Sequence, residues 1–137
     1  MALTFTAPFA QVPKTSTAVV TAAGTFDTDT PTNTSLIVTA GSDGCIVTSL
    51  AAMPRATATA SKLMLFLSKD SGTTKRFIDS VLMAAYTSNT TTATPVTIFS
   101  SISEGAPLRL EAGDQLYVSS AVALASGIVF EAQFTNF

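Results

Sequence analysis

The chain carries few charged side chains for its length, and this shortage limits the folds that it can adopt. Only 12% of its 137 residues are Asp, Glu, Lys or Arg, against about 25% in an average soluble domain. An all-helical protein places Lys and Glu on the solvent-facing sides of its helices. Here 38 residues are instead Thr or Ser, and Thr fits the pleated, half-buried surface of a strand. The sequence therefore predicts an all-β protein.

The apolar content is sufficient for one packed core. Apolar residues make up 47% of the chain, and a chain of this length is expected to form one domain that buries roughly two-thirds of its unfolded surface. The formal net charge is only −2, whereas disordered chains combine low hydrophobicity with high net charge. We therefore expect a single folded domain.

Short apolar or alternating segments, separated by turn residues, predict about eight strands. Such spacing is typical of a sandwich or barrel, and we favour an antiparallel β-sandwich of jelly-roll type. A helix remains the alternative for residues 76–85, because Phe77, Val81 and Ala84 also lie at helical spacing. The expected extended segments are residues 17–22, 34–40, 45–53, 57–67, 76–84, 96–102, 108–110, 116–122 and 128–134.

Residues 1–16 differ from the rest of the chain. Leu3-Thr4-Phe5-Thr6 alternates, but Pro8 and Pro13 are incompatible with a central strand. We expect an extended N-terminal arm over residues 1–16 that contacts a neighbouring chain, followed by a sandwich domain over residues 17–137; a frayed terminus is the alternative. The expected partner-interface residues are Leu3, Phe5, Phe9, Val12 and Phe137.

The composition excludes several classes of function. The chain has no His, so it lacks the general base of Ser-His-Asp and Cys-His catalysis. Its single cysteine, Cys45, can form neither an internal disulfide nor a zinc cluster, and its apolar neighbours predict a buried thiol. Seven dispersed basic residues do not give the footprint of a nucleic-acid-binding protein. We expect no enzyme activity and no cofactor or metal.

No targeting or membrane-spanning segment is expected. The residues after Met1 lack the basic start and the long apolar stretch of a signal peptide. The longest strongly apolar runs, residues 63–67 and 81–86, fall far short of the ~18 residues that a membrane helix requires. The sequence therefore predicts a soluble protein made in a cytosol, with neither membrane nor nucleic acid among its partners.

Two groups of acidic residues are candidate sites. Asp27-Thr28-Asp29 resembles the start of a calcium loop, but Thr32 and Val38 stand where an EF-hand needs Gly and Glu; an Asx turn is the simpler interpretation. Glu104, Glu111 and Asp114 could act as an acid–base group, although solvated loop charges explain them more simply.

Four basic residues, Lys62, Lys69, Lys75 and Arg76, surround one predicted hairpin. Together they could form a small patch that docks an acidic partner. We favour ordinary solubilising charges that protect strand edges from association.

Three segments resemble small structural proteins of tailed bacteriophages. They read VTAGSDGCIVTSLAAMPRATATASKLMLFLSKDSG, KRFIDSVLMAA and LRLEAGDQLYVSSA, and a closing apolar-aromatic strand follows. In that group a TAG-x-x-G turn precedes a strand and an Ala/Thr-rich stretch. A LFLSKDSG-like hairpin comes next, and an L-x-x-GD-x-L-Y-V segment lies near the end. The resemblance covers roughly residues 34–137.

The resemblance implies a virion component at the capsid surface, synthesised in the host cytoplasm. The most direct expectation is a trimeric decoration or cement protein that binds between subunits of the phage major capsid protein and stabilises the head. Alternatives are a small tail or baseplate part, or a head spike. A ligand-binding β-sandwich is a further alternative, but two Tyr and no Trp offer little for a sugar-binding platform.

Overall fold

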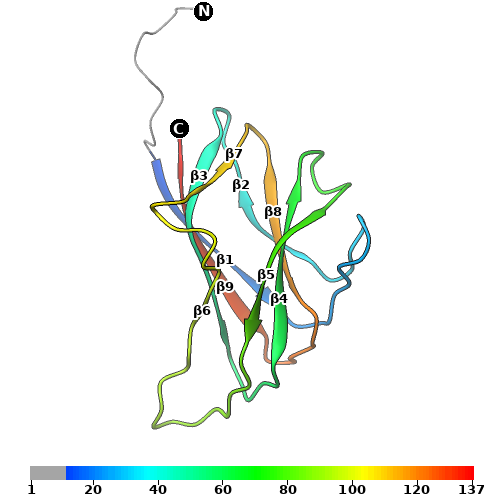
Figure 1. Cartoon of the computed structure of the whole chain (residues 1–137), viewed down its shortest axis with the longest axis vertical. Coiled ribbons are helices and arrows are strands. Elements are labelled where there is room, and N and C mark those ends of the chain that lie inside the picture. The colour runs from blue at the N-terminus through cyan, green and yellow to red at the C-terminus, as the bar shows by residue number, and fades with distance from the viewer. Residues whose placement is uncertain (1–11) are drawn as a thin grey trace, which may run out of the picture.

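A computed structural model describes residues 12–137 of the chain, and these residues form nine strands and no helix (Figure 1). The prediction of an all-β fold is confirmed, and each of the nine expected extended segments overlaps one strand. The strands are β1 (Val12–Val20), β2 (Ser35–Thr39), β3 (Cys45–Pro54), β4 (Ser61–Ser68), β5 (Arg76–Met83), β6 (Thr97–Ile98), β7 (Leu108–Leu110), β8 (Gln115–Ser120) and β9 (Ile128–Asn136).

The two halves of the chain pair with each other from the ends inward. β1 pairs with β9, β2 with β8, β3 with β7, and β4 with β5, all antiparallel. The resulting first sheet has the order β1-β9-β3-β6, with β7 also paired to β3, and the second has the order β2-β8-β4-β5. This nested pairing across two sheets is a jelly roll, so the predicted jelly-roll-like antiparallel sandwich is confirmed.

The boundary of the expected N-terminal arm needs correction. Residues 12–16 belong to β1, where Val12 lies opposite Asn136 on β9. Pro13 is compatible with this strand because β1 is an edge strand, which tolerates a missing N–H donor. Leu3, Phe5 and Phe9, predicted to contact a partner, lie outside the described residues.

Other boundaries differ more modestly. The helical alternative for residues 76–85 is wrong, because residues 76–83 form β5, which pairs antiparallel with β4 and has one register shift at Ile78. Of the expected strand over residues 96–102, only Thr97–Ile98 pairs with β3. β4 begins at Ser61, later than expected.

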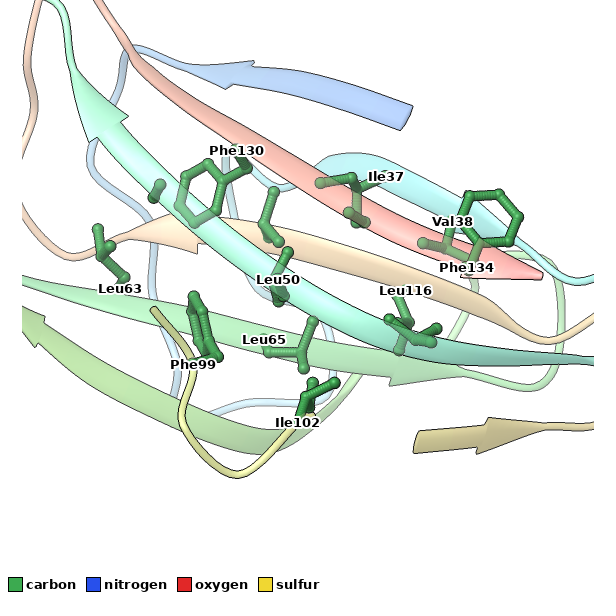
Figure 2. Close-up of a cluster of buried hydrophobic side chains, with 14 of the residues drawn as sticks. Ile37, Val38, Leu50, Leu63, Leu65, Phe99, Ile102, Leu116, Phe130 and Phe134 are labelled. Carbon is green, nitrogen blue, oxygen red and sulfur yellow. The ribbon is translucent and has the colours of Figure 1, made fainter. Parts of the chain in front are cut away.

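Alternating side chains of the strands fill the space between the two sheets. On β9, Ile128, Phe130 and Ala132 are buried, whereas Glu131 and Gln133 are exposed on the opposite face. Figure 2 shows Phe130 of β9 and Leu50 of β3 in one cluster with Leu65 of β4, which belongs to the facing sheet. The core therefore follows from the period of two that is visible in the sequence.

The outer face of the second sheet is partly covered by residues 21–34, which we call the covering segment. The Gly24 N–H donates to the Ser120 carbonyl at 2.8 Å, and the Ser119 hydroxyl donates to the Asn33 carbonyl at 3.2 Å. The Lys75 N–H donates to the carbonyl of Asp29 at 2.9 Å. These bonds attach the segment to β8 and to the hairpin between β4 and β5.

Aromatic packing joins the covering segment to the same face. The Phe26 ring lies 5.7 Å from that of Phe77, which lies 5.5 Å from that of Phe66. Phe66 and Met64, which is two residues earlier on β4, are completely buried, although both point away from the main core. β4 is thus buried on both faces, and for this reason residues 63–67 form a continuous apolar run.

The connections between strands gather at two ends of the sandwich (Figure 1). The start of β1, the C-terminus and the turns β2–β3, β4–β5 and β7–β8 lie at one end, which we call the terminal end. The loops of residues 55–60, 84–96 and 121–127 lie at the other.

Gly24 provides a test of the covering segment. A Cβ at this position would overlap the Ser119 hydroxyl and lie 2.6 Å from the Thr32 carbonyl oxygen. We expect Gly24→Ala to destabilise the protein by about 1–3 kcal/mol, as overpacking commonly does. Gly105→Ala is the matched control, because its Cβ would have no neighbour closer than 4.0 Å. Urea unfolding gives the midpoint of each variant, and equal midpoints for the two variants would contradict the close approach of the covering segment to Ser119 on β8.

Candidate interaction surfaces

The three acidic residues weighed as an acid–base group do not form one. Asp114 lies in the β7–β8 turn, where its Oδ2 accepts hydrogen bonds from Lys69 Nζ at 2.8 Å and from the Glu111 N–H at 3.0 Å. Its side chain is only 7% exposed, so the expectation of a solvated loop charge is wrong for Asp114. Glu104 is exposed on a separate turn. Asp114 therefore fastens one turn to the neighbouring hairpin.

The four basic residues of the predicted hairpin each have a different partner. Lys69 lies 2.8 Å from Asp114 and 3.4 Å from Glu111, and the hydrogen bond to Asp114 is the largest cause of the raised pKa of Lys69. The other contacts are Lys62 Nζ over the Phe26 ring at 3.7 Å, Lys75 Nζ over the Tyr117 ring at 4.4 Å, and Arg76 Nε to Asp29 Oδ1 at 3.3 Å. These cations hold loops against the second sheet and do not present one shared docking patch.

The Asp27-Thr28-Asp29 segment has contacts within the protein. The Asp29 carboxylate pairs with Arg76, and the Thr28 hydroxyl accepts a hydrogen bond from the Thr30 N–H at 3.3 Å. The threonine thus makes the local turn contact that we expected from an aspartate. Within residues 12–137, no three acidic, Cys or His side chains gather where they could hold a metal ion.

Cys45 is completely buried at the start of β3, as its apolar neighbours predicted. Burial, with a smaller contribution from the charge of Asp114, raises the pKa of its thiol to about 11. Only the thiolate is an effective nucleophile. The thiol is therefore protonated and unreactive near neutral pH.

The end formed by residues 55–60, 84–96 and 121–127 is poor in charge, and we call it the charge-poor end. The last two loops contain no charged residue. Arg55 adjoins them, and its Nε donates to the Ser126 carbonyl at 2.7 Å. This guanidinium therefore links two loops to each other.

Exposed apolar side chains concentrate at the charge-poor end. Val19 lies opposite Val129 on β9, which lies opposite Met53 on β3, so an apolar row crosses three strands. Leu82, near the end of β5, is the most exposed large apolar residue of the described chain at 66%. Six of the eleven exposed large apolar side chains lie there: Val19, Met53, Leu82, Val96, Ile98 and Val122. Clusters of this kind mark surfaces that contact other macromolecules.

Two charge-free stretches of the sequence are the signal that could have predicted this surface. Residues 80–103 and residues 115–130 contain no Asp, Glu, Lys or Arg. The fold brings the loops within these two charge-free stretches to the same end of the sandwich.

A separate apolar groove lies between the open edges of the two sheets, beside β5. Its volume is about 370 Å³. Asp79 is its one charged lining residue, and the Asp79 carboxylate accepts a hydrogen bond from the Ser101 hydroxyl. The groove is lined by Leu65, Leu67, Ile78, Asp79, Ser101, Ile102, Ala106, Pro107 and Leu108.

Two of the predicted interface residues lie at the terminal end. Val12 is 48% exposed on the edge strand β1. Phe137 is half-buried, and its N–H donates to the Gly44 carbonyl at 3.2 Å. The structure therefore places both residues at the same end of the sandwich, where the described part of the chain begins and ends.

Removal of the buried carboxylate tests the structural role of Asp114. We expect Asp114→Ala to lower the free energy of unfolding by about 1–3 kcal/mol, because the Glu111 N–H loses its acceptor and Lys69 its closest partner. Glu104→Ala, at an exposed position, should change it by less than about 0.5 kcal/mol. Urea unfolding distinguishes the two variants, and equal effects would show that the Asp114 contacts contribute nothing.

The buried thiol predicts a specific loss of stability in alkaline solution. The pKa of Cys45 rises from its ordinary value of 9.0 to about 11, so the unfolded chain releases this proton at lower pH than the folded chain. The protonated Cys45 thiol therefore contributes about 2–3 kcal/mol to the free energy of unfolding below pH 9. This contribution is lost as the pH rises from 9 to 11. Unfolding free energies of the wild type should fall more steeply over this range than those of Cys45→Ala. Parallel profiles would contradict the raised pKa.

Comparisons with known proteins add no functional assignment. No protein-family model, no curated protein and no solved structure matches the chain. Residues 12–137 also include no helix that is long and apolar enough to cross a membrane.

Proposed function

We propose that this chain is a non-enzymatic structural protein of a bacteriophage virion, which decorates the capsid and stabilises the head. The observation that carries the proposal is the charge-poor end, with its exposed Met53, Leu82 and Ile98. The central parts of protein interfaces are depleted in charged residues and enriched in Met and aromatic residues. Such a surface suits lasting contact with another protein better than free exposure to water.

The fold is compatible with this role. Jelly rolls occur in viral capsid domains, and also in lectins and cupins. Because one fold can support many functions, this is support by analogy. The resemblance of residues 34–137 to small phage structural proteins favours the virion among these possibilities.

The side chains that could have indicated catalysis have structural partners. Asp114 and Lys69 pair with each other, and Asp29 pairs with Arg76. The Cys45 thiol is buried and protonated. These contacts stabilise loops and the core, which is the expected use of charge in a structural subunit.

The physical effect of decoration follows from mass action. A protein that binds the assembled shell, and not the separate subunits of the major capsid protein, stabilises the assembled state in proportion to the logarithm of its concentration over its dissociation constant. We propose that the charge-poor end contacts the shell where subunits meet. Symmetric sites favour a closed oligomer such as a trimer.

Fractionation of virions tests the proposal. Heads and tails are separated, and this chain is quantified against the major capsid protein in each fraction. We expect the chain in the head fraction at a fixed ratio to the major capsid protein. A few copies in the tail fraction would replace decoration by a tail role, and its absence from both fractions would overturn the virion proposal.

Charge introduced at the charge-poor end tests which surface binds. Leu82→Lys and Ile98→Lys should each reduce the affinity for heads by about tenfold or more, because a buried apolar contact is replaced by an unpaired charge. Leu36→Lys is the matched control, since Leu36 is also exposed (45%) but lies on β2, outside this end. Co-sedimentation with heads measures all three. Equal loss in the control would place the contact elsewhere.

A further inference from the structure

We infer that the apolar groove beside β5 receives residues 1–11 of a second copy of this chain, so that an arm of one copy docks in the next. The inference concerns association between copies of the free protein. It therefore goes beyond the proposed function, and it can be tested without virions.

The groove presents apolar surface that another segment can cover. It lies where β5 ends the second sheet and residues 101–108 end the first, with a volume of about 370 Å³. Ile78 is 42% exposed on it. Its one lining carboxylate, that of Asp79, accepts hydrogen bonds from the Ser101 hydroxyl and the Ser80 N–H, so the carboxylate keeps hydrogen-bond partners when an apolar occupant covers the groove.

The neighbouring strand edge offers backbone hydrogen bonds. Within the described chain, β5 pairs with β4 on one side only. The N–H and C=O groups of an edge strand readily accept an extended segment as an additional strand. A docked segment would therefore gain both apolar burial and main-chain hydrogen bonds.

Residues 1–11 have the composition that this site requires. They contain no charged side chain, and Leu3 and Phe5 alternate with Thr4 and Thr6. In an extended segment, side chains two residues apart point to the same side. Leu3 and Phe5 can thus face the groove together while the threonines face outward.

The position of β1 favours the groove of a second copy over the chain's own groove. At the terminal end, Val12 lies beside Asn136, Asn136 beside Cys45, and Cys45 beside Leu110. Three strand spacings, about 14 Å, therefore separate the start of β1 from β7. β1 and β7 lie on opposite sides of the first sheet, so the chain's own residues 1–11 would have to cross β9 and β3 to reach its own groove, whereas the groove of a second copy requires no such crossing.

The available length is sufficient for contact between copies. Eleven extended residues span at most about 36–40 Å. The contact joins an arm on one copy to a groove on the next, so it is heterologous. Such contacts close into rings when the rotation permits, and the trimer expected from the sequence resemblance is one such ring.

Three full-length variants test the inference by sedimentation. Wild-type protein should associate, and Phe5→Asp in the arm and Ile78→Asp in the groove should each reduce the sedimenting mass to that of one chain, 14.1 kDa. Leu36→Asp is the control, because Leu36 is about as exposed as Ile78 (45% against 42%) but lies on β2 and does not line the groove. It should associate as the wild type does. Thermal unfolding of each variant verifies that it is folded.

Mixing two defective variants gives the decisive result. The intact arm of Ile78→Asp can enter the intact groove of Phe5→Asp, so an equimolar mixture should contain a dimer that neither variant forms alone. Monomeric wild type, a mixture without dimers, or equal loss of association in Leu36→Asp would each overturn the inference. If the arm contact forms but the protein does not bind heads, the proposed function fails and this inference stands.

Discussion

The pairing of β9 with β1 on one side and β3 on the other is the contact on which the rest of the sandwich depends. Nine residue pairs join β9 to β1, and nine more join it to β3. The last strand of the chain is thus central to the first sheet, and its inward side chains Ile128, Phe130 and Ala132 lie in the core. Because these pairings link distant parts of the sequence, the jelly roll closes only when both halves of the chain are present.

Much of this architecture was predictable from local patterns. The sequence predicted an extended segment over residues 128–134, which is β9, and two extended segments over residues 57–67 and 76–84, which form the β4–β5 hairpin. The start of β1 was not predicted, because Pro13 excludes a central strand but is tolerated at an edge. Which strand occupies an edge depends on the complete sheet order, and the sequence pattern does not specify that order.

The candidate surfaces differ in how far the sequence indicated them. Burial of Cys45 was predictable because its nearest neighbours are apolar. The pairing of Asp114 with Lys69 was not predictable, because 45 residues separate them in the sequence. The register of β4 with β8 brings the two turns that carry them together. The charge-free stretches were visible from the beginning, but their meeting at one end is a property of the topology.

The two ends of the molecule suggest a division of roles in the proposed assembly. The terminal end carries the arm and lies near the groove that would join copies, whereas the charge-poor end would face the shell. The most direct measurement is to add purified protein to heads from which it has been removed and to follow bound copies and the temperature of DNA release. The account predicts saturation at a fixed ratio to the major capsid protein and a higher release temperature. Absence of binding, or binding that leaves the release temperature unchanged, would contradict it.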